Sequence, residues 1–461
     1  MAGMRRRAIW LGAVLGLWAC GDDAGADGTD SGSSSTTTGV TSTSDGSTSG
    51  GSTNADTSSG GAGTETTDGE SSGDDATTTG AMASCTAPTL EETFELDPNG
   101  PNGQIHPAVF YDASLDAVWV TYNVPSEDGS GQFDVFATRV GCDGQAQLDP
   151  VRVNQTLGDN DIDPELVRTD AGLLVVWSSD DGTGGGSNLD IRMQLLDDDG
   201  FAQWSADHVL ETTFEGAPFT ASAWMPRISA GAGGDVAVVG TRGIEAASAF
   251  QVFVQRVAGD GSSLGSTVAW APMPGIAHDT PHLAVDADGD AWTAWVRTED
   301  FVLRQVETGR VVGDAFAAAT PTLLQNTDST GPSVVSTSDG VFVAVSEALG
   351  AGRRVSVVGL EPAVAEVMLG ETGLHHTPAL APVPGGVAVA AYRNLGGLDN
   401  ELWVARVNND ATATVPVAIP GAVAAPYATT ITHVGDGVVF VAWAQGDSPN
   451  FRVFGRLVSA R

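Results

Sequence analysis

The sequence predicts an all-β domain built from seven copies of a four-stranded unit, preceded by a long disordered linker. Three observations lead to this prediction. Prolines recur about every 50 residues between positions 107 and 426, each beside an apolar strand pattern. The chain of 461 residues contains 59 glycines and 22 prolines, which supply the turns that many short strands need. Residues 21–84, in contrast, contain almost no large apolar side chains.

The N-terminal residues have the order of an export signal. Arg5, Arg6 and Arg7 precede an apolar run over residues 8–19, which is too short to cross a membrane. The run ends in the tetrapeptide Leu17-Trp18-Ala19-Cys20. This tetrapeptide resembles the lipobox of bacterial lipoproteins, and the alternative is an ordinary secretory signal followed by a free cysteine.

The resemblance implies that residues 1–19 are a lipoprotein signal peptide and that Cys20 carries a diacylglyceryl thioether. It further implies acylation of the new N-terminus, with palmitate as one such chain, and two or more acyl chains anchor a protein stably in a membrane. Gly21 follows the cysteine in place of the aspartate that the common retention rule requires. We therefore expect a lipid-anchored protein of the cell envelope, in the outer membrane.

Residues 20–84 predict a disordered tether that begins at the lipidated Cys20. The stretch consists mainly of Gly, Ser, Thr, Asp and Ala. Such a composition cannot bury enough apolar surface to offset the entropy lost on ordering.

The repeat begins near residue 92 and has four parts. An apolar strand follows each marker proline, then a very apolar second strand, a third strand and a fourth strand before the next proline. Fourth strands are expected, for example, at 208–211 and 322–325. The marker prolines are Pro107, Pro164, Pro226, Pro281, Pro332, Pro378 and Pro426.

Four strands repeated seven times resemble a seven-bladed β-propeller, here spanning residues 85–461. The alternative, an array of β-sandwich domains, needs a longer period. The last unit lacks a fourth strand, whereas the segment Glu92–Leu96 precedes the first unit. We therefore expect this segment to close the ring as the outer strand of the last blade, paired with residues 451–458.

The chain contains three cysteines, for which we expect two roles, lipidation and a disulfide. With Cys20 assigned to the lipid, Cys85 and Cys142 remain in an exported chain, where paired cysteines are common. We expect a disulfide that fastens the closing strand, the alternative being two buried free thiols.

Strand phase indicates which inner-strand residues approach the central channel. The residue after each marker proline is variable and often polar, and the following residue is apolar, so period two places the first set toward the channel. With the histidines and aspartates beside the prolines, this gives a set of candidate binding residues at the channel mouth: His106, Asp163, Glu165, Arg227, His282, His376 and Tyr427.

Metal sites have weaker support. Asp286, Asp288 and Asp290 alternate as in a calcium loop but lack the downstream acidic ligand, so an ordinary Asp/Gly turn is favoured. No cofactor is expected, with calcium as the one weak candidate. The chain has no Gly-x-Ser-x-Gly elbow and no phosphate-loop lysine, and we find no sialidase-type aspartate box, so no catalytic residue is assigned.

Charge limits the class of partner. A net charge of −38, with every basic residue an arginine, argues against nucleic acid as a partner. We expect a monomeric binding or scaffolding module for an unknown protein or glycan, held at the membrane through its lipid anchor. The alternatives are a polysaccharide hydrolase or lyase with its site at the channel mouth, and a cation-stabilised adhesion module.

The anchor can be tested with Cys20→Ala. Without the thiol the precursor cannot accept the diacylglyceryl group, so we expect the protein to leave the membrane fraction when cells are fractionated. Full retention of the variant in membranes would contradict the lipobox interpretation.

Overall fold

The structure is a computed structural model, and it describes most of the chain after residue 91. The described residues are 85, 92–127, 130–180, 189–210, 213–214, 217–218, 222–231, 234–244, 249–270, 276–299, 303–317, 331–349, 352–396, 399–422, 427–446 and 449–461. The expected signal peptide, Cys20 and the tether lie outside them. Within these ranges, no helix has the length and apolar character needed to span a membrane.

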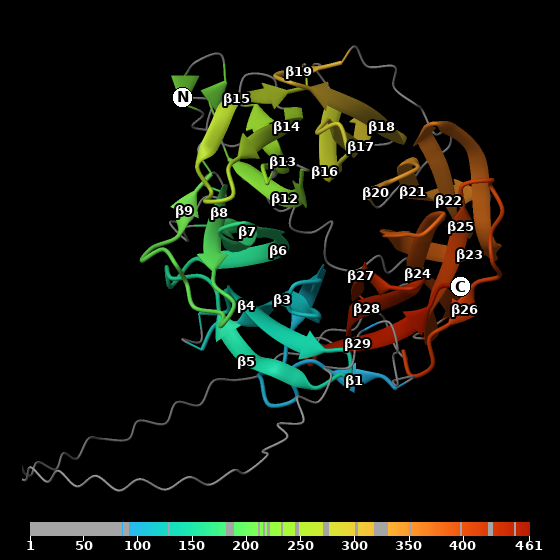
Figure 1. Cartoon of the computed structure of the whole chain (residues 1–461), viewed down its shortest axis with the longest axis horizontal. Coiled ribbons are helices and arrows are strands. Elements are labelled where there is room, and N and C mark those ends of the chain that lie inside the picture. Colours follow the sequence, from blue (N-terminus) through green and yellow to red (C-terminus); the bar gives the residue numbers. More distant parts are fainter. Residues whose placement is uncertain are drawn as a thin grey trace, which may run out of the picture. The chain divides into compact units, whose positions relative to one another are not determined.

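The described chain folds as a seven-bladed β-propeller, as predicted. Figure 1 looks down the ring, with the first strand of each blade near the centre and the last at the rim. Blades 1 to 4 are four-stranded: β2(Ile105–Asp112), β3(Ala117–Pro125), β4(Phe133–Gly141), β5(Ala146–Arg152); β6(Asn160–Thr169), β7(Gly172–Asp180), β8(Leu189–Leu196), β9(His208–Val209); β12(Ala223–Ala230), β13(Val236–Ile244), β14(Ala249–Val257), β15(Ser263–Ala269); β16(Ile276–Val285), β17(Ala291–Glu299), β18(Leu303–Val312), β19(Ala315–Phe316).

Blades 5 and 6 share one long strand. β23(Ala363–Val383) is the outer strand of blade 5 at its start and the inner strand of blade 6 at its end. The other strands of blades 5, 6 and 7 are β20(Ser333–Thr337), β21(Gly340–Leu349), β22(Gly352–Glu361); β24(Gly386–Gly396), β25(Asp399–Asn408), β26(Val417–Ala418); β27(Tyr427–Gly435), β28(Val438–Gln445), β29(Arg452–Ser459) and β1(Phe94–Glu95). A hairpin, β10(Thr213–Phe214) and β11(Ala217–Pro218), lies between blades 2 and 3 in the sequence.

One predicted fourth strand, at 322–325 in blade 4, lies outside the described residues. Within them, β18 pairs with the short strand β19, which follows a two-residue turn. Gly313 in that turn has a φ of 58°, a conformation that glycine adopts readily.

Apolar packing between blades holds the ring together. Among the described residues, seven buried clusters each occupy one interface between neighbouring blades. In β7, for example, Leu173 packs toward blade 1 and Leu174 toward blade 3. Both faces of the second strands are therefore buried, which explains their continuous apolar runs.

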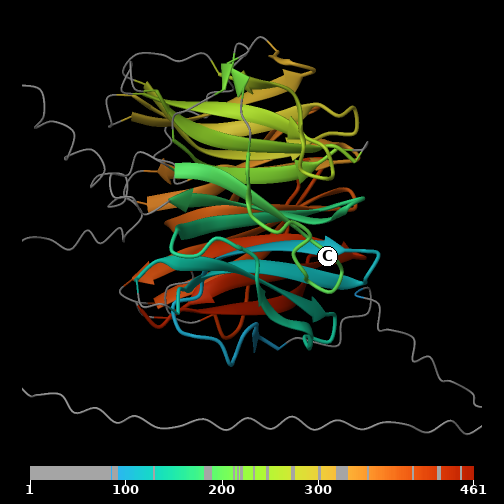
Figure 2. The same ribbon diagram turned by 90° about the vertical axis from the view of Figure 1, so that its left-hand side faces the viewer.

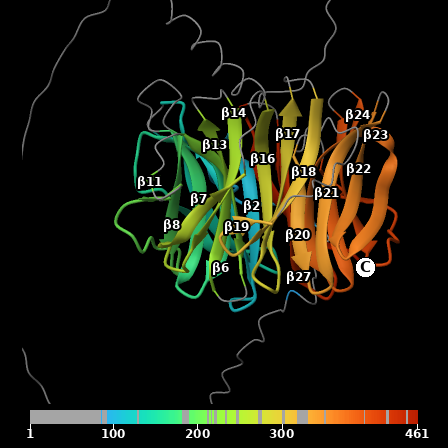
Figure 3. The same cartoon turned by 90° about the horizontal axis from the view of Figure 1, so that it is seen from above.

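Six inner strands share a bulge. In blades 1 to 4, 6 and 7 the pairing with the second strand skips two residues, and in all of these except blade 7 the second skipped residue is the marker proline. The first skipped residue has a positive φ in five blades, at His106, Asp163, Met225, Thr280 and Ala428. Side views show the strands running across the thickness of the ring (Figures 2 and 3).

The position of the bulge in blade 7 shows that the predicted register of its inner strand was wrong. There the skipped pair is Ala428-Thr429, so Thr430 takes the position that Ala108 and Glu165 take in blades 1 and 2. Tyr427 precedes the bulge and is not the equivalent of those residues, because Pro426 is not the bulge proline of this blade. Ile431 accordingly packs between blades 6 and 7.

The ring closes as predicted. β1 pairs antiparallel with β29, with Phe94 opposite Gly455 and Glu95 opposite Phe454. The Leu96 N–H donates to the Val453 carbonyl at 2.9 Å. In Figure 1 the blue β1 lies beside the red β29 at the rim, so the two ends of the described domain complete one sheet.

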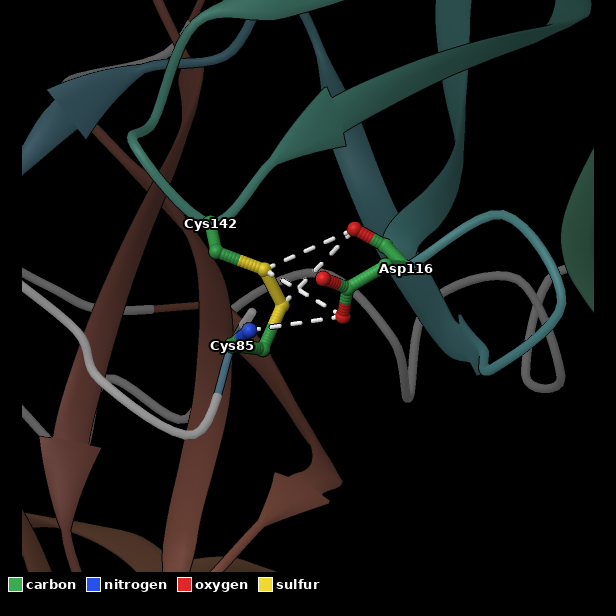
Figure 4. A group of neighbouring side chains, drawn as sticks. All are labelled: Cys85, Asp116 and Cys142. Carbon is green, nitrogen blue, oxygen red and sulfur yellow. Dashed lines mark hydrogen bonds between the residues drawn. A yellow bond between two sulfur atoms is a disulfide. The ribbon is translucent and has the colours of Figure 1, made fainter. Parts of the chain in front are cut away.

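The predicted disulfide between Cys85 and Cys142 is present. It joins the start of the described domain to the turn after β4, and Asp116 lies beside both sulfur atoms (Figure 4). The Asp116 carboxylate accepts hydrogen bonds from the Cys85 N–H at 3.3 Å and from the Tyr111 hydroxyl at 2.6 Å. The closing segment is thus bonded covalently to blade 1 and by backbone hydrogen bonds to blade 7.

Leu96→Ala tests the contribution of the closing strand. Leu96 is 3% exposed and packs in the cluster between blades 7 and 1. Its truncation should lower the free energy of unfolding in urea by about 2–5 kcal/mol. Val417→Ala is the matched control, because Val417 also lies on an outer strand but is 60% exposed. Equal effects of the two changes would contradict a stabilising closure.

Candidate functional site

Five of the seven predicted binding residues come together where the inner strands of blades 1 to 4 meet. Their printed contacts are with neighbouring inner strands: His106 lies against Asp163, Glu165 against Arg227, and His282 against Val334 of blade 5. We call this set the inner-strand cluster, and its members are His106, Asp163, Glu165, Arg227 and His282.

Two close side-chain contacts connect the first three blades of the cluster. Nδ1 of His106 lies 2.9 Å from Oδ1 of Asp163. Nε of Arg227 lies 3.2 Å from Oε1 of Glu165. The Glu165 and Arg227 side chains are 27% and 26% exposed, so solvent and small polar groups reach this pair.

The two carboxylates of blade 2 have opposite pKa shifts. Burial raises the pKa of Glu165, and this effect outweighs the opposing charge of Arg227. Burial acts on Asp163 in the same direction, but the charges of His106 and Arg227 and contact with His106 hold the pKa of Asp163 below its usual value. Neighbouring carboxyl groups with divergent pKa values are a common arrangement for an acid and a base.

His282 contributes a neutral imidazole. Its Nδ1 accepts a hydrogen bond of 3.1 Å from the Val334 N–H of blade 5. Burial, together with the charge of Arg227, lowers the pKa of His282 to about 3. The ring is therefore uncharged at neutral pH.

A buried amide, Asn123, positions the blade 2 segment from blade 1. Asn123 is fully buried in β3; its Nδ2 donates to the Asp161 carbonyl at 2.8 Å and its Oδ1 accepts from the Asp163 N–H at 3.2 Å. Ser178 of blade 2 positions the start of the blade 3 inner strand in a similar way, because its Oγ accepts a hydrogen bond from the Met225 N–H at 2.9 Å. Sequence reasoning missed Asn123, although an amide in an otherwise apolar strand was a signal for it.

Blade 4 adds further buried ionisable groups beside the cluster. Burial raises the pKa of Asp279, with Arg304 opposing. His278 is fully buried, and its Nε2 lies 3.5 Å from Oε2 of Glu307. Trp295 donates to the same Glu307 oxygen at 3.1 Å.

The remaining predicted site residues take other roles or are not described. The side chains of His376 and Tyr427 lie outside the described residues. Asp286 accepts hydrogen bonds from the N–H groups of Asp288 and Asp290, which forms the turn favoured over a calcium loop. Asp290 pairs with Arg310 at 2.7 Å, so its carboxylate already has a cation.

One group of three metal-type ligands lies close together among the described residues, namely Cys85, Asp116 and Cys142. The two sulfur atoms are bonded to each other in the disulfide, so they are not available as thiolates (Figure 4). This cluster therefore has a structural explanation.

Comparisons with known proteins show the fold. No protein-family model matches the chain, and no curated protein matches it. A protein of unknown function from Dyadobacter fermentans is similar in structure, with a TM-score of 0.51 and 11% identity over 80% of this chain and 98% of that one. A polysaccharide lyase described as an ulvan lyase, solved bound to -[GlcA(1-4)Rha3S]-, has a TM-score of 0.54 and 13% identity over 78% of this chain and 95% of that one.

Asp161→Asn tests the electrostatics beside the cluster. Asp161 is fully buried and accepts a hydrogen bond from Trp177 Nε1 at 2.9 Å, and burial raises its pKa to about 7. Between pH about 4 and 7 the folded protein keeps a proton that the unfolded chain has lost, so stability falls as pH rises through this window. Asparagine does not titrate.

The variant should therefore lose less stability over that range, by on the order of 3 kcal/mol. Urea unfolding of both proteins at several pH values measures the difference. Parallel stability curves for the wild type and the variant would contradict the raised pKa.

Proposed function

We propose that this protein cleaves a polysaccharide by acid–base chemistry at the inner-strand cluster. The observation that carries the proposal is the pair of carboxyl groups in blade 2, Glu165 and Asp163, whose pKa values are shifted in opposite directions. Hydrolysis of a glycosidic bond needs one carboxylic acid and one carboxylate. The favoured reaction is therefore hydrolysis.

Each residue of the cluster has a chemical role in this proposal. Glu165, with its raised pKa, donates a proton to the leaving glycosidic oxygen. Asp163 remains ionised and acts as the base or nucleophile on the opposite side of the bond. Arg227, 3.2 Å from Glu165, positions that side chain and stabilises it after the proton has left.

Similarity in fold supports the polysaccharide as substrate over the scaffold that composition favoured. The ulvan lyase shares this fold over most of its length. At 13% identity this likeness establishes the fold alone. The substrate class of this chain is therefore proposed from the residues of the inner-strand cluster.

A lyase is the second candidate, and a specific contact favours it. His106 lies 2.9 Å from Asp163, an arrangement in which a carboxylate orients an imidazole that can take a proton from a sugar carbon. Both reactions release a new reducing end, but elimination leaves an unsaturated sugar at the other new end, whereas hydrolysis leaves a saturated one. Analysis of the product distinguishes the two reactions.

The location of this activity is also a proposal. A lipid on Cys20 would hold the enzyme at the outer membrane, and residues 21–84 would separate the propeller from the lipid surface. Polysaccharides of the cell exterior or envelope would then be within reach.

Glu165→Gln tests the proposed acid. The amide cannot supply a proton, so release of reducing ends from a polysaccharide panel should fall by roughly 10²–10⁴-fold. In the wild type, activity should also fall as pH rises through the raised pKa of Glu165, because the acid is lost. Glu401→Gln is the matched control, since Glu401 pairs with Arg393 at 2.6 Å and is 29% exposed, but lies in blade 6.

Full activity of Glu165→Gln, or equal losses in the two variants, would exclude Glu165 as the acid. Absence of new reducing ends and unsaturated products with every polysaccharide in the panel would leave the binding module as the better account.

A further inference from the structure

The hydrogen bond to His282 fixes which of its ring nitrogens carries the proton. A neutral imidazole has one N–H donor and one acceptor nitrogen. Because Nδ1 accepts from the Val334 N–H, the proton resides on Nε2. His282 therefore presents a permanent N–H donor from Nε2, and within the described part of the chain this donor has no acceptor.

Arg227 lies on the neighbouring blade and also has donor capacity left. Its Nε faces Glu165 at 3.2 Å, and its Nη1 donates to the Pro226 carbonyl at 2.8 Å. No described residue accepts from its Nη2. Arg227 and His282 take the same position, directly after the bulge, on the inner strands β12 and β16. The two strands lie side by side, because the Val285 N–H of β16 donates to Ser229 Oγ of β12 at 3.1 Å. The charge of Arg227 also acts on the His282 ring, so the two groups face one region between blades 3 and 4.

We infer that Nη2 of Arg227 and Nε2 of His282 together bind an anionic substituent of the sugar. This inference rests on the proposed function, which it extends by naming the substrate as an acidic polysaccharide. The substituent is a uronate carboxylate or a sulfate ester, since both present oxygen acceptors with negative charge. A hydrogen bond from a guanidinium to such an oxygen is stronger than one to a neutral hydroxyl.

The negative charge of the whole chain determines which ligands are suitable for measuring binding at this site. A net charge of −38 repels a long anionic polymer at a distance, and salt screens that repulsion. A short oligosaccharide carries few charges, so its affinity reports mainly the local contacts. Binding is therefore measured with oligosaccharides of equal length at moderate ionic strength.

The experiment is calorimetric titration of the full chain with three oligosaccharides: galacturonic acid oligomers, sulfated galactose oligomers and neutral galactose oligomers. We expect one of the two anionic ligands to bind roughly ten- to a hundredfold more tightly than the neutral one. Whichever it is identifies the substituent. Equal affinity for all three, or no binding of any of them, would overturn the inference.

Two substitutions of His282 separate hydrogen bonding from packing. His282→Leu removes both the acceptor and the donor, and should abolish the preference for the anionic ligand. His282→Gln retains an acceptor for the Val334 N–H and a donor for the ligand, so it should restore most of the preference. His433→Leu is the control, because His433 lies on the inner strand of blade 7 and is partly buried.

A leucine variant with unchanged preference, or a glutamine variant as impaired as the leucine one, would contradict the role of His282. Failure of this inference is distinguishable from failure of the proposed function. Cleavage of neutral polysaccharides only would contradict the anion site and leave the enzyme proposal standing. Tight binding of the acidic oligosaccharide without any cleavage would support the anion site and contradict the enzyme proposal.

Discussion

Closure of the ring is the constraint on which the rest of the structure depends. An open blade 7 would expose β29 as an unpaired edge, and unpaired edges associate with other chains. The closing strand forms two residue pairs with β29, so its backbone hydrogen bonds alone fix it weakly. Burial of Leu96 and Phe94 against Phe440 of blade 7, together with the disulfide, supplies the remaining stabilisation. With the ring closed, every inner strand has a neighbour on both sides.

That arrangement allows polar side chains to act between blades. Each inner strand presents one set of side chains to the preceding blade, where apolar residues such as Leu166 and Leu283 pack. The alternate set reaches the next blade, as when Ser333 accepts a hydrogen bond from the Leu380 N–H. The repeated bulge fixes the height of these contacts in the ring. The residue directly after the bulge therefore contacts the neighbouring inner strand, as His282 does through the Val334 N–H.

The sequence predicted the blades because strand patterns and turn residues are local signals. It also predicted the closing strand, since a count of units showed which strand was missing. It misplaced Tyr427, because a proline that lies before the bulge has the same appearance in sequence as a proline within it. The partners in the cluster were beyond prediction. The contact between Glu165 and Arg227 depends on the angle between two blades, which no local pattern encodes.

The cluster combines partial exposure with strong electrostatic effects. At an exposed surface, water would screen the charges of Glu165 and Arg227, and the pair would contribute little. In a fully buried position, desolvation would make both charges costly. Where the inner strands meet, the surrounding backbone removes most of the water but leaves each side chain about a quarter exposed. Burial there raises the pKa of Glu165 while the charges of His106 and Arg227 keep Asp163 ionised, so two carboxyl groups of one strand acquire different protonation states. The propeller supplies the rigid support that such a difference requires, because each member of the cluster is held by a strand that its neighbours on both sides keep in place.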